Sequence, residues 1–244
     1  MHFPLARGKG FVLRHVVRLL PVELREVEVE VPPGGRVRAR WDEVIGRKLL
    51  RDGSFERAEI GAMLGTVTAQ STVIDVGANV GLVTIPLALA TARVIAVEPL
   101  PQNIEQLRGN VRRNDLTNVV VVEAAAGAAD GTAVLHSAAD PAFGSLHEVV
   151  KYRAAGDLEV TLRSLDSLWE ELGRPVVGLV KIDVEGAEVE VLEGGRELLS
   201  ACGPAVLVEV GASGSAVREL LAALGYAETT PPGLSTENHL YRRR

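Results

Sequence analysis

Short apolar runs, separated by polar turns and by segments with helical spacing, recur along this chain of 244 residues. Four of these runs are rich in β-branched residues, which is typical of buried strands, and they lie at 72–76, 93–97, 119–122 and 176–182. Between the second and the third run, Ile104, Leu107 and Val111 recur at the spacing of one helix face. Strands that alternate with helices in this way favour an α/β fold built on a mostly parallel sheet.

The second half of the chain continues the alternation. A helix is expected after residue 182, and it ends at Gly194-Gly195. Glu188 falls among the apolar positions of that helix, so either it pairs with a buried cation or the helix begins differently. The remaining pattern predicts short strands around 133–135 and 158–162, a strand at 205–210, a helix at 214–224 and a last strand at 238–241.

The first 53 residues are expected to form an extension to a domain at 54–244. Residues 26–31 and 36–41 alternate apolar with charged positions, which predicts a hairpin whose glutamates and arginines pair across the two strands. Two helices are expected next, at 42–50 and 55–65, with Ser54 as the N-cap of the second. We interpret the extension as a candidate lid or dimer contact.

The strand at 72–76 leads into a turn of small residues and then into an apolar helix. Gly77 lets the backbone turn sharply, and Gly81 allows a ligand or the sheet to approach closely. Glu98 ends the next strand and follows Asp75 by 23 residues, close to the spacing of about 20 at which an acid accepts from ribose hydroxyls. This arrangement predicts a nucleotide cradle, although Pro86 is expected to kink the helix or remove one of its hydrogen bonds.

The turn differs from a dinucleotide fingerprint. Gly-x-Gly-x-x-Gly is absent, and Asp75 directly precedes the turn. A carboxylate repels a pyrophosphate and attracts a cationic amino-acid ligand. This reasoning favours S-adenosylmethionine, which carries a sulfonium and an ammonium, over NAD.

Four motifs together resemble the FkbM family of S-adenosylmethionine-dependent methyltransferases. They are Asp-Val-Gly-Ala-Asn-Val-Gly at 75–81, Glu98-Pro99, Asn110 with Asn114, and Lys-Ile-Asp-Val-Glu-Gly-Ala-Glu at 181–188. The resemblance extends over residues 45–241. It implies a class I methyltransferase fold, a Rossmann-like and mostly parallel sheet of seven strands with an antiparallel C-terminal strand, preceded here by the hairpin and helical extension.

The resemblance also implies where the cofactor binds. The residues after the third strand would line its adenine, and the acids at the strand ends would face one crevice. The candidate cofactor-binding residues are Asp75, Gly77, Ala78, Asn79, Gly81, Glu98, Pro99, Asn103, Glu123, Ala124, Ala125 and Asp183.

Methyl transfer to a hydroxyl requires alignment of the reactants, exclusion of water and a base for the hydroxyl proton. Asp183 and Glu185 are the first candidates for that base, because they lie at the carboxyl end of the fourth strand. Lys181 is a candidate for orienting a carboxylate or a substrate hydroxyl, and His239 and Glu209 are further catalytic candidates. Asp183 and Glu185 could also be two hard ligands for a metal, but no third ligand is evident, so no metal is expected.

Composition narrows the classes of partner. A net charge of −6 argues against a nucleic-acid surface, which needs clustered Lys and Arg. The single Cys202 excludes an intrachain disulfide and suits a reducing cytoplasm. There is no apolar run of about 18 residues and no secretory leader, so we expect a cytoplasmic protein without a membrane partner. A homodimer stays open as its assembly.

The preferred hypothesis is an O-methyltransferase, as the resemblance implies, that acts on a hydroxyl of a small metabolite such as a sugar or a polyketide-type natural product. One alternative is an NAD(P)-dependent oxidoreductase on a related sheet. The other is a non-catalytic S-adenosylmethionine-binding protein, which would keep the cofactor residues without a competent base.

Overall fold

The computed structural model describes residues 26–244 except 42, 53–55, 139–143, 146–153 and 212–213. The expected N-cap Ser54 lies outside the described residues, and helix α3 begins just after Glu56, whose side chain makes no capping hydrogen bond. No helix in the described part of the chain is long and apolar enough to cross a membrane.

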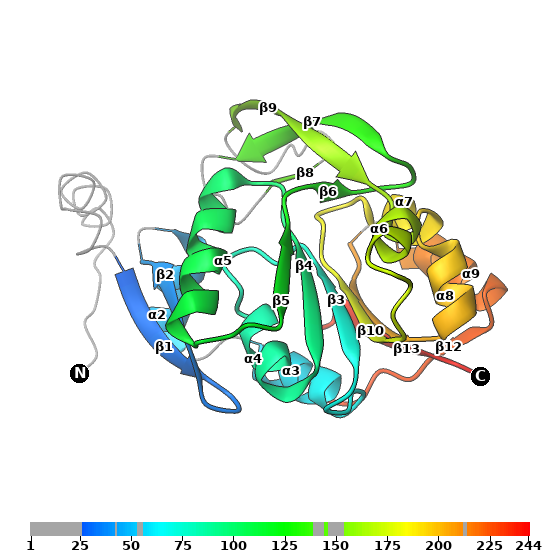
Figure 1. Cartoon of the computed structure of the whole chain (residues 1–244), viewed down its shortest axis with the longest axis horizontal. Coiled ribbons are helices and arrows are strands. Elements are labelled where there is room, and N and C mark those ends of the chain that lie inside the picture. Colours follow the sequence, from blue (N-terminus) through cyan, green and yellow to red (C-terminus); the bar gives the residue numbers. More distant parts are fainter. Residues whose placement is uncertain (1–25, 42, 53–55, 139–143, 146–153, 212–213) are drawn as a thin grey trace.

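A seven-stranded sheet forms the centre of the molecule, in the order β12-β13-β11-β10-β3-β4-β5 (Figure 1). Five strands are parallel: β3 (Thr72–Val76), β4 (Arg93–Val97), β5 (Val119–Val122), β10 (Val177–Ile182) and β11 (Ala205–Glu209). The last strand, β13 (Asn238–Arg243), runs antiparallel to β11 and to the short β12 (Tyr226–Glu228). The expected class I sheet is confirmed, whereas β12 was not anticipated because it is only three residues long.

Helices cover both faces of this sheet, so the central strands are apolar on both sides. On one face, Val73 and Val94 pack against α3 (Arg57–Leu64) and α4 (Thr84–Ala90), and the longer α5 (Pro101–Arg113) follows beside β4 and β5. On the other face, Ile74 and Ile95 belong to a core with four helices: α6 (Leu165–Glu171), α7 (Glu188–Glu193), α8 (Arg196–Cys202) and α9 (Gly214–Ala223). Pro86 lies in the first turn of α4, where an N–H has no intrahelical partner, so the expected cost to the helix is small.

Helix α7 is shorter than the sequence pattern predicts. Glu185 and Gly186 both have positive φ angles, of 53° and 109°, and a helix cannot pass through such residues. The helix therefore begins at Glu188, whose buried carboxylate accepts a 2.7 Å hydrogen bond from the Gly186 N–H. The expectation that the helix begins differently is thereby confirmed.

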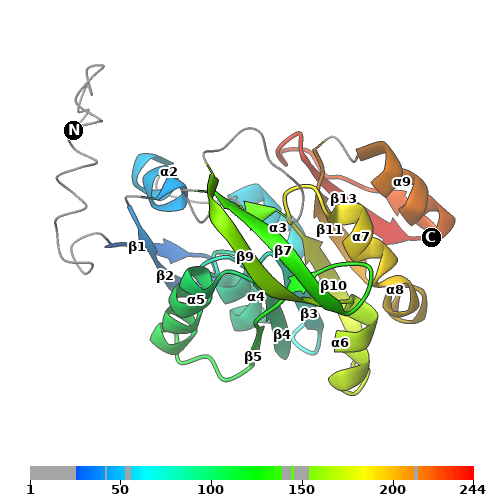
Figure 2. The same cartoon turned by 90° about the horizontal axis from the view of Figure 1, so that it is seen from above.

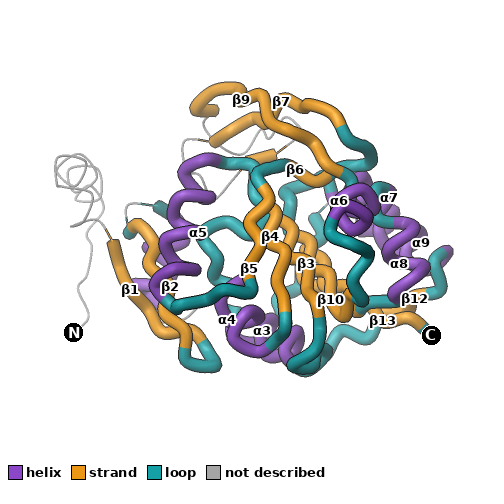
Figure 3. Tube along the Cα trace, in the orientation of Figure 1, coloured by secondary structure: helices purple, strands orange, loops and turns teal. Residues whose placement is uncertain are grey.

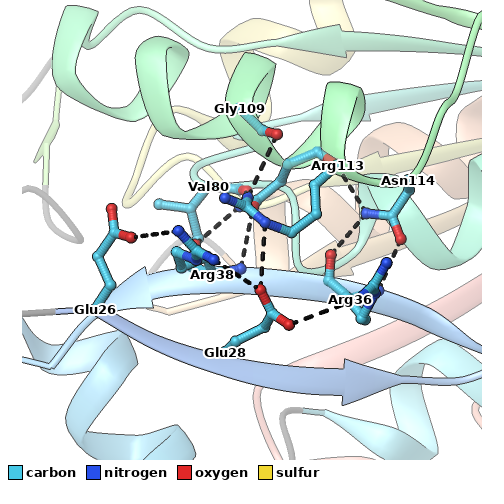
Figure 4. Close-up of polar contacts among 9 residues, drawn as sticks. Glu26, Glu28, Arg36, Arg38, Val80, Gly109, Arg113 and Asn114 are labelled. Carbon is cyan, nitrogen blue, oxygen red and sulfur yellow. Dashed lines mark hydrogen bonds and ion pairs between the residues drawn. The ribbon is translucent and has the colours of Figure 1, made fainter. Parts of the chain in front are cut away.

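The N-terminal hairpin pairs β1 (Glu26–Val31) with β2 (Gly35–Arg40), as predicted. Its apolar side packs on α2 (Val44–Asp52) and on α4. Arg38 bridges Glu26 and Glu28 at 3.0 and 3.1 Å, which confirms the cross-strand ion pairs for this arginine (Figure 4). Arg40, in contrast, makes an ion pair with Glu43, beyond the hairpin.

Two asparagines bind the edge of β2 that does not pair with β1: Asn110 lies within α5, and Asn114 caps the end of that helix. The side-chain amide of the fully buried Asn110 accepts from the Arg38 N–H at 2.8 Å and donates to the Arg38 carbonyl at 2.9 Å. Asn114 makes the same pair of bonds with Arg36 (Figure 4). Asn110 also donates to the Val80 carbonyl at 2.8 Å. The asparagines thus supply the hydrogen bonds that a neighbouring strand would supply, and Asn110 ties the hairpin to the glycine turn.

A second, smaller sheet lies across the carboxyl ends of the central strands (Figures 1, 2 and 3). Its order is β6 (Ala125–Ala126), β9 (Ala154–Arg163), β7 (Gly131–Ala138) and β8 (Gly144–Ser145). The pattern around 133–135 and 158–162 predicted the middle of β7 and the second half of β9. Leu135 and Val160 pack on Leu100 and Ala125, which fixes this layer above the sheet edge.

We expect Asn110→Ala to lower the free energy of unfolding by about 2–3 kcal/mol, because it leaves buried backbone groups of Arg38 and Val80 without partners. Asn114→Ala is the matched control, with an expected loss below about 1 kcal/mol since water can replace the amide at its more exposed bonds. Urea denaturation followed by circular dichroism measures both. Equal losses in the two variants would contradict this account of the hairpin anchor.

Candidate active site

The glycine turn after β3 is shaped by two close contacts. Gly77 has a φ of +76°, and a Cβ there would lie 1.9 Å from the backbone oxygen of Asp183. Gly81 has a φ of +94°, and a Cβ there would lie 2.7 Å from Leu107 of α5. The N–H groups of Gly77 and Ala78 donate to the Val97 carbonyl at 3.0 and 3.1 Å. Gly77 therefore permits the approach of β10, and Gly81 permits the approach of α5.

The carboxylate of Glu98 joins this turn to α5. It accepts hydrogen bonds from the Asn79 N–H at 2.9 Å, the Leu100 N–H at 3.1 Å and the Asn103 side-chain amide at 3.0 Å. Burial raises the pKa of Glu98 above its ordinary value, and these three hydrogen bonds act in the opposite direction. Glu98 is thus held in one position at the end of β4.

Lys181 is a buried cation at the centre of the site. Its Nζ donates to the Gly77 carbonyl at 3.1 Å and to Asp183 Oδ2 at 3.3 Å. Asp75 Oδ1 lies 3.5 Å from Nζ and accepts no hydrogen bond from a described residue, while Oδ2 accepts from the Thr84 hydroxyl at 2.6 Å. Burial acts against the ammonium, but the carboxylates of Asp183 and Asp75 outweigh it and raise the pKa of Lys181. Lys181 therefore stays charged and orients its partners.

These residues surround a cavity of about 240 Å³ at the carboxyl ends of the strands from β11 to β4. One part of its wall comes from the ends of β4 and β5 and from β6 and β7, and it is mainly apolar: Val97, Leu100, Ala124, Ala125, Ala126 and Leu135. The other part is charged and combines β10 and β11 with α2 and the start of α3: Lys48, Glu56, Lys181, Asp183, Glu185 and Glu209. Together with Glu98, the described wall holds five acidic residues and two lysines.

The cavity brings together most of the candidates that the sequence indicates. Those that line it are Gly77, Ala78, Asn79, Glu98, Pro99, Asn103, Ala124, Ala125, Lys181, Asp183, Glu185 and Glu209. Asp75 and Gly81 lie behind its wall instead. Since Asp75 is paired with Lys181, the argument that its charge repels a pyrophosphate does not hold, and the charge that selects the ligand belongs to the lining acids.

Two candidates lie elsewhere. Glu123 is exposed and makes a 2.6 Å ion pair with Arg108, away from the cavity lining. His239, the second residue of β13, is 2.7 Å from Glu228 and also lies outside the lining. Within the described ranges, no three His, Cys, Asp or Glu side chains group as ligands for a metal ion.

The resemblance implies that the N-terminal helices lie over the cofactor pocket, but sequence reasoning selected none of their residues. Ile45 and Lys48 of α2 line the cavity, as does Glu56 at the start of α3. Sequence reasoning could not select Glu56, because that residue lines the cavity from a left-handed backbone conformation with φ 40° and ψ 46°.

Comparison with known proteins gives a family match. The methyltransferase FkbM domain matches residues 75–228, more than half of the chain. The chain belongs to the FkbM methyltransferase family. Membership confirms the class of enzyme and S-adenosylmethionine as its cofactor, and it removes the nicotinamide oxidoreductase alternative.

The chain is similar to several solved structures, and one of them, with a TM-score above 0.5, supports the fold. A methyltransferase FkbM from Methylobacillus flagellatus KT has a TM-score of 0.52 and 19% sequence identity over 72% of this chain, and this chain covers 44% of its length. An rRNA methylase from Streptococcus thermophilus has a TM-score of 0.49 and 12% identity, with 77% of this chain and 96% of that one covered. TYW2 from M. jannaschii, solved with AdoMet, has a TM-score of 0.49 and 13% identity, with coverages of 90% and 87%. No curated protein matches the sequence.

The residues of the FkbM domain fit this cofactor. S-adenosylmethionine carries a sulfonium and an ammonium and no phosphate, and the charged wall has an excess of carboxylates over lysines. Gly77 also lines the cavity, and its lack of a Cβ lets the Asp183 backbone approach the turn.

Two acids of the FkbM cavity have strongly shifted pKa values. Burial raises the pKa of Glu56 to about 7, with Lys181 acting against this shift and Asp183 adding to it. Burial also raises the pKa of Glu209 to about 8, and Asp183, Glu56 and Glu185 add to this shift while Lys181 opposes it. Both groups hold a proton at a pH where an exposed glutamate has lost it.

These shifts predict how the stability of the FkbM domain depends on pH. Between their ordinary value of 4.5 and about 8, Glu56 and Glu209 bind more protons in the folded state than in the unfolded state, so the free energy of unfolding falls as pH rises. Urea midpoints measured across this range test the slope. The double variant Glu56→Gln with Glu209→Gln is expected to have a flatter profile, and an unchanged slope would contradict the assigned shifts.

Proposed function

We propose that this FkbM domain is an O-methyltransferase that acts on a hydroxyl group of a small metabolite, such as a sugar or a polyketide-type natural product. The observation that carries the proposal is one cavity in the described part of the chain, whose wall has a mainly apolar part that suits a nucleoside and a carboxylate-rich part beside it. An acceptor that enters the carboxylate-rich part meets groups able to take a hydroxyl proton. The domain then needs no separate substrate site.

The lining residues suggest how the cofactor lies. Glu98 accepts from the ribose hydroxyls, as an acid at the end of the second strand of a nucleotide cradle does. Ala124 and Ala125 contact the adenine. Gly77 and Asn79 offer backbone groups to the methionine part, and Asp183 and Glu185 attract its ammonium. Bound in this way, the cofactor supplies a methyl group on a positively charged sulfur.

The chain's own residues then align the acceptor and exclude water. The small sheet contributes Leu135 and the N-terminal extension contributes Ile45, both to the cavity wall. This supports a role for the extension as a cover of the site. Lys181, a fixed cation, orients Asp183 and does not itself accept a proton.

The size and charge of the site support a small acceptor in preference to a nucleic acid. The described wall combines five acids with two lysines, and the net charge of the chain is −6. A phosphate backbone requires the opposite balance. Release of S-adenosylhomocysteine in the presence of a panel of monosaccharides and polyketide lactones would identify the acceptor class. Turnover with none of these hydroxyl acceptors but with an amine panel would contradict O-methylation, and no turnover at all would favour a non-catalytic binding protein.

Calorimetric titration with S-adenosylhomocysteine tests the cofactor site directly. We expect saturable binding to the wild type and a loss of about 10–100-fold in Glu98→Gln, because a charged acceptor of ribose hydrogen bonds is replaced by a neutral one. Glu105→Gln, on the exposed side of α5, is the matched control and keeps the wild-type affinity. Absence of binding to the wild type, or binding of NADH in its place, would contradict the proposal.

A further inference from the structure

Glu209 occupies the end of the cavity farthest from Glu98 along the sheet. It is the last residue of β11, and its neighbour across the β10–β11 pair is Asp183, since Ile182 lies opposite Val208. The strands that separate it from β4 are β10 and β3. Three inter-strand steps amount to about 14 Å, so Glu98 and Glu209 stand at opposite ends of the cavity.

The contacts of Glu209 differ from those of the other acids beside it. Asp183 accepts from Lys181 at 3.3 Å, and Glu56 lies 4.0 Å from Lys48. Glu185 has a partner of its own and belongs to the tight loop before α7. The Glu209 side chain makes no hydrogen bond or ion pair with another described residue, and it lines the cavity. Within the described ranges, no side chain or backbone group therefore occupies its oxygens.

The raised pKa of Glu209 suits a general base. Burial and the negative charges of Asp183, Glu56 and Glu185 raise its pKa to about 8, against the opposing charge of Lys181. A carboxylate with a pKa near the working pH accepts a hydroxyl proton far better than an ordinary exposed one. Because the cofactor adds positive charge to the same cavity, its binding favours the ionised form of Glu209, the form that acts as a base.

We propose that Glu209 is the catalytic residue that removes the proton of the acceptor hydroxyl, an inference that rests on the proposed function. The acceptor oxygen forms a bond to the methyl carbon as the carbon–sulfur bond breaks. The electron pair of that bond stays on sulfur, which becomes a neutral thioether, and the hydroxyl proton passes to the Glu209 carboxylate. In this arrangement, the carboxylates of Asp183 and Glu185 attract the cofactor ammonium and contribute negative charge to the site.

The first test compares the kinetics of Glu209→Gln with those of the wild type on the acceptor found with the monosaccharide and lactone panel. We expect kcat to fall by about 10²–10⁴-fold, with an S-adenosylhomocysteine affinity close to the wild-type value. Glu209→Asp restores part of kcat, and Glu219→Gln, on the exposed side of α9, changes neither quantity. The acidic limb of the wild-type pH profile of kcat disappears in Glu209→Gln. A Glu209→Gln variant that keeps the wild-type kcat would overturn the proposal.

A second test needs no acceptor. Carbon-13 NMR of side-chain carboxyls, with the Glu209 signal identified by its loss in Glu209→Gln, follows the titration of this residue with and without S-adenosylhomocysteine. We expect a titration well above the ordinary value of 4.5 and a shift of the signal when the thioether binds. A Glu209 signal that titrates at its ordinary value and ignores the thioether overturns the inference. If the wild type does not bind S-adenosylhomocysteine, the proposed function itself fails, so the two failures are distinct.

Discussion

The ammonium of Lys181 holds the site together. It lies between β3 and β10 and contacts the carbonyl of the glycine turn and the carboxylates of Asp75 and Asp183. A charge taken out of water is costly unless it is paired and hydrogen-bonded. Asp75 is fully buried and depends on this cation, and the cation in turn depends on the two acids. The ends of two neighbouring strands are thereby locked in one geometry.

From this centre, polar contacts extend outward to the edge of the molecule. The turn that Lys181 holds is bound on its other side by Glu98, which also binds Asn103 of α5. Further along α5, Asn110 binds both the Val80 carbonyl and the hairpin strand β2. One helix thus sets the distance between the glycine turn and the N-terminal hairpin. Substitutions far from the cavity can therefore change its shape.

The sheet could be predicted because its strands are short, apolar and β-branched, and because buried parallel strands need apolar residues on both faces. The strand β5 is apolar although it is only half-buried, because it lies at the sheet edge. The start of α7 could not be predicted, because it depends on positive φ angles at Glu185 and Gly186. Periodicity carries no information on such angles.

The site was predictable where a residue's place along a strand determines its position, as for Glu98, Lys181 and Asp183. It was less predictable where side-chain direction decides. Asp75 and Glu123 both follow the expected spacing, but Asp75 turns into the protein to meet Lys181, and Glu123 turns outward to meet Arg108. Glu56 enters the cavity from a segment far away in sequence, a tertiary contact that no local pattern encodes.

The central claim is that the buried charges of Lys181 and Asp75 preorganise the cofactor cavity. Calorimetric titration of the double variant Asp75→Asn with Lys181→Met tests it most directly, since removing both charges avoids the cost of leaving one of them buried without a partner. The account predicts a folded protein whose affinity for S-adenosylhomocysteine is at least about tenfold weaker than that of the wild type, because Gly77 and Asp183 lose their common contact. A folded double variant with the wild-type affinity would contradict it.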